Sequence, residues 1–138
     1  MSFGKKANKE ESSMDAHRPL ILLVEDNPYI TDIILDSLKG YFDVVPISTV
    51  EAALKYMATN SQIDVLICDF SLNHSSLDGF DVIICFQDKY PEKQSILFTS
   101  HIFSEEQLDS FSLNKNLKFF DKIQFPEMID FICGLLNK

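Results

Sequence analysis

The sequence has 138 residues, 46% of them hydrophobic, and a formal net charge of −9. This length fits one domain, and its apolar runs are far shorter than the ~20 residues that a membrane-spanning helix needs. Residues 1–18 carry a net charge of +1, so the remaining chain carries −10 and has no basic face with which to bind nucleic acid.

The first 18 residues are almost entirely polar. Such a segment has little apolar surface to bury, so we expect a disordered tail over 1–18 and one domain over 19–138. The tail also lacks the apolar run of a signal peptide, which predicts a cytoplasmic protein. Cys68, Cys85 and Cys133 are odd in number and lie among apolar residues, which favours reduced, buried thiols.

Strands and helices alternate from residue 19 onward. The apolar run at 20–25 predicts a strand. The helical spacing of the next apolar residues predicts a helix over 29–40, with Asn27 as its cap, Pro28 in its first turn and Gly40 at its end.

The alternation continues to the end of the chain. Ser48 and Glu51 have capping-box spacing, as have Ser104 and Gln107. Pro46 indicates that the second strand lies at a sheet edge. The further expected elements are strands at 42–47, 64–69, 94–100 and 117–122, and helices at 48–60, 80–90, 104–113 and 125–136, of which the helix at 104–113 should be short or irregular.

Five strands that alternate with five helices predict an α/β fold. Parallel strands need crossover connections, and right-handed crossovers place helices on both faces of the sheet. We therefore expect a doubly wound parallel sheet with no second domain.

Carboxylates end two of the predicted strands. Glu25 and Asp26 end the first strand and Asp69 ends the third, and the strand order 2-1-3-4-5 would make these strands neighbours at the edge where such sheets bind ligands. The repulsion between the acids, roughly 4 kcal/mol per pair at about 4 Å, predicts a divalent cation. Oxygen ligands at an open cleft favour Mg²⁺.

The next two strands end in groups of a different kind, the hydroxyl of Thr99 and the ammonium group of Lys122. Acids, a metal, a hydroxyl and an ammonium together are typical of a phosphoryl-transfer site. Asp69 is the expected nucleophile because it stands alone, whereas Glu25 and Asp26 are adjacent and better arranged to hold a metal.

The segments "ILLVEDNP", "DVLICDF", "LDGFDVI", "ILFTS" and "FFDK" occur in this order. Together they resemble the receiver domain of bacterial two-component response regulators, over nearly all of residues 19–138. The resemblance implies a five-stranded sheet of order 2-1-3-4-5 with five helices. It also implies Mg²⁺-dependent transfer of a phosphoryl group to Asp69 from a histidine kinase or a histidine phosphotransfer protein.

The resemblance assigns a role to each matching residue. Asp26 would bind Mg²⁺ directly, Glu25 through water, and the carbonyl oxygen of Ser71 would be a further ligand. Thr99 and Lys122 would contact the phosphoryl group on Asp69.

Phe119 falls at the family's aromatic switch position, although a phenylalanine in a short apolar strand is equally compatible with plain core packing. A switch there would change the surface formed by the fourth helix, fifth strand and fifth helix, where a downstream protein would bind.

The sequence departs from the family pattern at two loops. Ile123 follows Lys122 where the family usually has a proline joined by a cis bond, so we expect a different loop shape. The loop after Asp69 is longer than usual and has "NHSS" in place of the customary proline, which bears on the choice of kinase and on dephosphorylation. His74 and His101 have no partner at zinc spacing and should be exposed, with His101 and Ser71 at positions that tune loss of the phosphoryl group.

Other sites on the same fold are disfavoured. Nucleotide-binding glycine motifs do not occur in the sequence, acids after the first strand would repel a flavin phosphate, and a metal-dependent phosphatase would want a carboxylate where Ser71 stands. The alternative that remains is a phosphorylation-independent interaction module, which Ile123 and the altered loop after Asp69 support.

We therefore predict a stand-alone response regulator in signal transduction. It would catalyse its own phosphorylation and dephosphorylation but would not be a metabolic enzyme. Because no effector sequence follows Lys138, we expect output through protein contact, with no nucleic acid and no membrane as partner.

Overall fold

A parallel five-stranded sheet forms the centre of the protein, which we describe from a computed structural model that covers residues 18–60, 62–72, 77–112, 114 and 116–136. The tail expected at 1–18 thus falls outside the described residues except for Arg18. The strands are β1 (Leu20–Val24), β2 (Asp43–Ile47), β3 (Val65–Cys68), β4 (Gln94–Thr99) and β5 (Leu117–Asp121). The helices are α1 (Pro28–Leu38), α2 (Val50–Thr59), α3 (Gly79–Lys89), α4 (Glu105–Ser112) and α5 (Phe125–Leu136), and a 3₁₀ turn, η1 (Lys122–Gln124), precedes α5.

The strand order is β2-β1-β3-β4-β5, and every pair is parallel. This confirms the predicted fold class and order. The pairing places Val24 of β1 beside Cys68 of β3, so both strands end at the same level of the sheet. Pro46 lies in the edge strand β2, as expected for a residue that cannot donate a backbone hydrogen bond.

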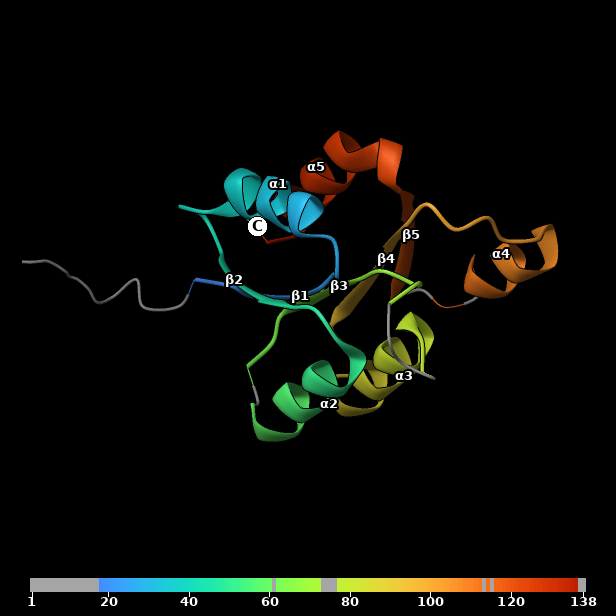
Figure 1. The fold of residues 1–138 in the computed structure, drawn as a ribbon, viewed down its shortest axis with the longest axis horizontal. Coiled ribbons are helices and arrows are strands. Elements are labelled where there is room, and N and C mark those ends of the chain that lie inside the picture. Colours follow the sequence, from blue (N-terminus) through green and yellow to red (C-terminus); the bar gives the residue numbers. More distant parts are fainter. Residues whose placement is uncertain (1–17, 61, 73–76, 113, 115, 137–138) are drawn as a thin grey trace, which may run out of the picture.

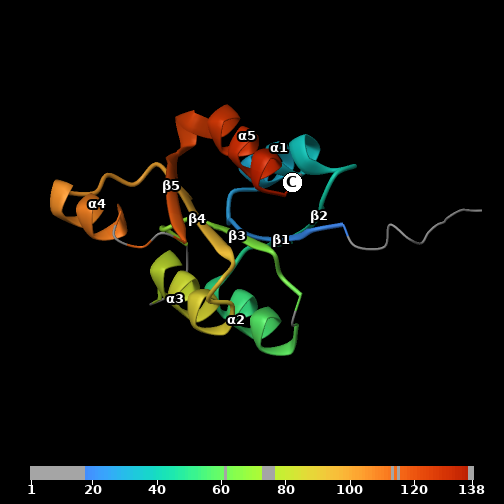
Figure 2. The ribbon, with the colours of Figure 1, turned by 180° about the vertical axis from the view of Figure 1, so that it is seen from behind.

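Helices cover both faces of the sheet, as predicted. Helices α1 and α5 lie on one face, α2 and α3 on the other, and α4 lies beyond the β5 edge (Figure 1). The reverse view shows the same layers, with α4 standing apart from the other helices (Figure 2). Helix α4 has eight residues, the fewest of the five helices, which agrees with the short helix expected there.

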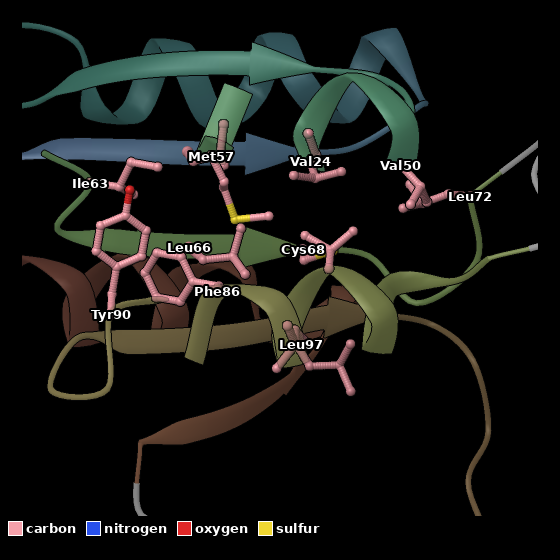
Figure 3. Close-up of a cluster of buried hydrophobic side chains, with 14 of the residues drawn as sticks. Val24, Val50, Met57, Ile63, Leu66, Cys68, Leu72, Phe86, Tyr90 and Leu97 are labelled. Atoms are coloured by element: carbon pink, nitrogen blue, oxygen red, sulfur yellow. The ribbon is translucent and has the colours of Figure 1, made fainter. Parts of the chain in front are cut away.

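Alternation along β1 divides the core into two parts. Ile21 and Leu23 belong to the cluster on the α1 and α5 side, whereas Leu22 and Val24 join the cluster under α2 and α3. Figure 3 shows Val24 among the side chains of the second cluster. All four side chains are at most 1% exposed. Full burial of such a side chain stabilises the fold by about 1.5–3 kcal/mol, so this unbroken apolar strand anchors both layers at once.

Two of the three cap predictions are confirmed. The Asn27 side chain accepts hydrogen bonds from the first amides of α1, and Ser104 and Gln107 form the expected reciprocal pair at α4. The cap predicted at Ser48 is wrong, because Thr49 takes that role with its hydroxyl accepting from the Ala52 amide at 3.1 Å. Both residues carry a suitable hydroxyl. Because α2 begins at Val50, Thr49 is the residue directly before the helix and is therefore its cap.

The cysteines are free, with Cys68 buried and Cys85 and Cys133 half-buried. The longest helix in the described part of the chain, α5, has 12 residues. No described helix combines the length and the apolar character that a membrane crossing needs.

Candidate functional site

Three carboxylates meet at the carboxyl edge of the sheet. Glu25 and Asp26 follow β1 and Asp69 follows β3, and because these strands are neighbours, oxygen atoms of all three side chains lie within 4.8 Å of one another. Glu25 and Asp69 are buried, with 4% and 8% exposure, while Asp26 is half-buried. The structure therefore brings together the acids that the sequence placed at the strand ends.

Lys122 completes this cluster from the end of β5. Its Nζ lies 2.8 Å from Glu25 Oε1 and 3.4 Å from Asp69 Oδ2, and its side chain is 18% exposed. The same Nζ lies 5.3 Å from the centre of the Phe98 ring, a cation–π distance. One cation thus bridges two buried carboxylates, which offsets part of their mutual repulsion.

The turn after β5 positions Lys122 without a proline. Asp121 caps η1, since its Oδ1 accepts from the Ile123 amide at 3.0 Å and Gln124 Oε1 accepts from the Asp121 amide at 2.9 Å. The peptide bonds of the described residues are all trans. A capped 3₁₀ turn thus directs the lysine into the acid cluster. The expectation that this loop differs in shape from the loop usual in the family stays a prediction.

Burial dominates the electrostatics of Glu25. Desolvation raises the pKa of its carboxyl group, the hydrogen bond and charge of Lys122 lower that pKa, and the Asp69 charge raises it again. The Asn27 amide donates to Glu25 Oε2 at 3.1 Å and lowers the pKa slightly. The net effect is a raised pKa, so Lys122 compensates for the burial of this acid only in part.

Helix α3 approaches the Asp69 backbone unusually closely. The Gly79 amide donates to the Phe70 carbonyl at 2.9 Å, and a Cβ atom built on Gly79 would lie 2.0 Å from the Asp69 carbonyl oxygen. The preceding residue, Asp78, forms a capping box with Asp81. Sequence reasoning gave Gly79 no role at the site, although an aspartate and a glycine at a helix start are a recognisable signal of a cap and a close approach.

The loop after Asp69 is only partly described. The Ser71 amide donates to Asp69 Oδ1 at 3.3 Å and so helps to orient the carboxylate. The carbonyl ligand role of Ser71 stays a prediction. Residues 73–76, which are the whole of the "NHSS" stretch and include His74, lie outside the described residues.

Thr99 and Phe119 lie on the neighbouring strands. Thr99 is 1% exposed, and its Oγ1 accepts the His101 amide proton at 3.2 Å, so this hydroxyl contacts the loop between β4 and α4. Phe119 is half-buried and packs against the core under α2 and α3. His101 is exposed, as expected. The switching roles of Thr99 and Phe119 stay predictions.

The donor set fits a hard divalent cation. The clustered atoms are carboxylate oxygens, which Mg²⁺ prefers. Glu25 and Asp26 also line an open cleft together with Thr31, Asp32 and Ser48, which leaves room for metal-bound waters. Of the groups predicted to hold Mg²⁺, the carboxylates of Glu25, Asp26 and Asp69 lie close enough together to share one ion.

Comparisons with other proteins give a result at the level of structure alone. No model of a protein family matches the sequence, and no curated protein matches it. Several solved structures do match. The signal receiver domain of an HD domain-containing protein from Pseudomonas fluorescens has a TM-score of 0.72 and 18% identity, over 87% of this chain and 94% of that one.

Two further matches are the phosphorylated cyanobacterial phytochrome response regulator RcpA and the BeF₃-activated receiver domain of DrrB from Thermotoga maritima. Each has a TM-score of 0.71 and 19% identity over 88% of this chain, and the matches span 96% and 100% of those chains. The protein therefore has the receiver fold of response regulators.

Proposed function

We propose that this chain is a single-domain response regulator, in which Asp69 accepts a phosphoryl group in a Mg²⁺-dependent step. The observation that carries the proposal is the meeting of three carboxylates with Lys122 at the carboxyl edge of a receiver fold. The donor would be a phosphohistidine on a histidine kinase or on a histidine phosphotransfer protein.

Phosphoryl transfer to Asp69 would exchange one bond to phosphorus for another. An Asp69 carboxylate oxygen attacks phosphorus, a P–O bond forms, the P–N bond to the donor imidazole breaks, and the imidazole keeps the electron pair and takes up a proton. Lys122 faces the Asp69 carboxylate and neutralises charge on the transferred group. Mg²⁺ held by Asp26, Glu25 and Asp69 would supply further charge neutralisation when bound.

Hydrolysis of the acyl phosphate would return the protein to its resting state. The protein would catalyse both its phosphorylation and its dephosphorylation and would act on no metabolic substrate. Thr99 would turn its hydroxyl from the His101 amide to the phosphoryl oxygens. Output would follow through the face formed by α4, β5 and α5, where Phe119 lies on β5 and a downstream protein would dock.

The test is Mg²⁺-dependent modification by a small phosphodonor. We expect acetyl phosphate with Mg²⁺ to add one phosphoryl group to the protein, detected as a mass increase by intact-protein mass spectrometry. Hydroxylamine, which cleaves acyl phosphates, should remove this group, and Asp69→Asn should abolish the modification. Asp36→Asn is the matched control, because Asp36 lies on α1 with a side chain that is 74% exposed and pairs only with Lys39 among the described contacts.

Wild-type protein that stays unmodified by acetyl phosphate, and whose amide spectrum does not respond to beryllofluoride with Mg²⁺, would refute the proposal. The phosphorylation-independent interaction module would then be the better account of the fold.

A further inference from the structure

A cluster of aromatic rings lies beside the acid site and is centred on one residue of the loop between β4 and α4. Phe103 is only 8% exposed although it belongs to this loop. Its neighbours come from the loop after β3, from α3, from its own loop, from α4 and from β5. We call the following six residues the Phe103 cluster: Phe70, Phe80, His101, Phe103, Phe111 and Phe119.

Phe103 contacts every other ring of the cluster. It meets Phe70, Phe111 and Phe119 edge to face, with ring centroids 5.2, 5.1 and 5.8 Å apart. The centroids of His101 and Phe80 lie 4.6 and 6.2 Å away in tilted arrangements. These separations are those at which aromatic pairs attract, so Phe103 is the packed centre of the group.

One side of the cluster touches the candidate phosphoryl site. Phe70 directly follows Asp69 in the chain, and its carbonyl accepts the Gly79 amide. His101 donates its amide proton to the Thr99 hydroxyl, and its ring lies 4.5 Å from that of Phe70. A change in the conformation of Asp69 or Thr99 therefore acts directly on rings that pack against Phe103.

The opposite side of the cluster holds α4. Residues 105–110 of this helix are all exposed, and the half-buried Phe111 packs its ring against Phe103 at 5.1 Å and against Phe80 at 4.9 Å. Helix α4 lies beyond the sheet edge, away from the other helices (Figure 1). Phe111 thus attaches α4 to the body of the protein through apolar contacts with this cluster.

We propose that Phe103 is the positioning residue that couples the candidate phosphoryl site to α4. This inference rests on the proposed function and adds the residue through which the site would move the helix. When Asp69 and Thr99 change, Phe70 and His101 shift against Phe103, and Phe103 shifts Phe111 and hence α4. Close-packed rings respond by changing between discrete arrangements instead of deforming gradually, which suits a two-state element.

The experiment compares Phe103→Leu with Phe131→Leu, each in the complete chain, by two-dimensional NMR with Mg²⁺ and beryllofluoride. Leucine keeps an apolar side chain but removes the ring. Phe131 is the matched control because it makes one aromatic pair, with Phe120 at 5.7 Å, in the core on the other face of the sheet.

In the wild type we expect beryllofluoride to shift the amides of Ser71 and Thr99 and those of Leu108 and Phe111. In Phe103→Leu the shifts at the site should persist, while those of α4 should fall by about twofold or more, and Phe131→Leu should leave both unchanged. Equal α4 shifts in the wild type and Phe103→Leu, or an equal loss in Phe131→Leu, would overturn the proposal.

A second arm needs no phosphoryl analogue. Phe70→Leu should change amide hydrogen exchange in α4, and it should lose this effect in the Phe103→Leu background. An identical effect of Phe70→Leu in both backgrounds would refute the coupling. If the wild-type site itself ignores beryllofluoride, the proposed function fails, and this ligand-free cycle alone decides whether Phe103 couples Phe70 to α4.

Discussion

Replacing Gly79 by alanine tests whether the close approach of α3 to the Asp69 backbone holds the phosphoacceptor in place. The new Cβ atom would lie 2.0 Å from the Asp69 carbonyl oxygen, 2.8 Å from the Phe70 Cα and 2.9 Å from the Asp69 carbonyl carbon. All three neighbours are backbone atoms, so no flexible side chain can move aside. The start of α3 and the end of β3 must separate by more than 1 Å to reach ordinary contact at 3.4 Å.

Both stability and chemistry should suffer. Forcing an extra methyl group into a packed site costs about 1–3 kcal/mol, so we expect the free energy of unfolding of Gly79→Ala to fall by about this amount. A shift of about 1 Å in a reacting group can cost roughly 100-fold in rate, so we expect phosphorylation by acetyl phosphate to slow by a comparable factor.

Urea unfolding and the rate of phosphorylation by acetyl phosphate measure the two effects. Gly134→Ala is the matched control, because nothing lies within 4 Å of the Cβ atom that it would add to α5. Alanine in place of glycine inside a helix should stabilise the protein by about 0.5–1 kcal/mol, the opposite sign. If Gly79→Ala is as stable and as reactive as the wild type, the close approach does not hold Asp69, and this reasoning is refuted.

Two further predictions concern the buried charges. Lys122→Met leaves Glu25 and Asp69 without their shared cation, so stability without Mg²⁺ should fall by about 3–5 kcal/mol in urea unfolding and recover in part when Mg²⁺ is added. Lys93→Met is the control, because the exposed Lys93–Asp64 pair should contribute at most about 1 kcal/mol, and equal losses in the two variants would contradict the bridging role. The raised pKa of Glu25 means that the folded state binds this proton more tightly than the unfolded state, so its contribution to stability falls as pH rises from the ordinary value of 4.5 through the raised pKa. With a chelator present to remove divalent cations, Glu25→Gln should abolish this decline in stability and should unfold at a higher urea concentration than the wild type at neutral pH. If the variant keeps the wild-type dependence of stability on pH, the decline does not come from Glu25.

The fold could be predicted from the sequence because the same pattern of a strand followed by a helix is repeated along the chain. Each apolar run of strand length is followed by an amphipathic helix, and the crossover rule then leaves few topologies. The meeting of Glu25, Asp26 and Asp69 follows from this topology, since it depends on which strands end side by side and little on side-chain conformation.

Features that depend on loops and on side-chain contacts were beyond sequence reasoning. Whether Ser48 or Thr49 caps α2 depends on one residue of difference in where the helix begins. The sequence predicted Lys122 at the site, but its direct contacts with Glu25 and Asp69 depend on the η1 turn, which no periodic pattern predicts. The burial of Phe103 was likewise unforeseen, because a single aromatic residue in a polar loop gives no period from which its contacts could be inferred.

The two edges of the sheet are protected by different means. Pro46 in β2 has no N–H with which a further strand could be paired, and β5 has α4 beside it (Figure 1). Strand addition, whether by a partner or by another copy during aggregation, is therefore discouraged at one edge by backbone chemistry and at the other by a helix that a few aromatic contacts hold in place. A sequence change that loosens α4 would uncover the backbone of β5 and so remove the protection of that edge against self-association.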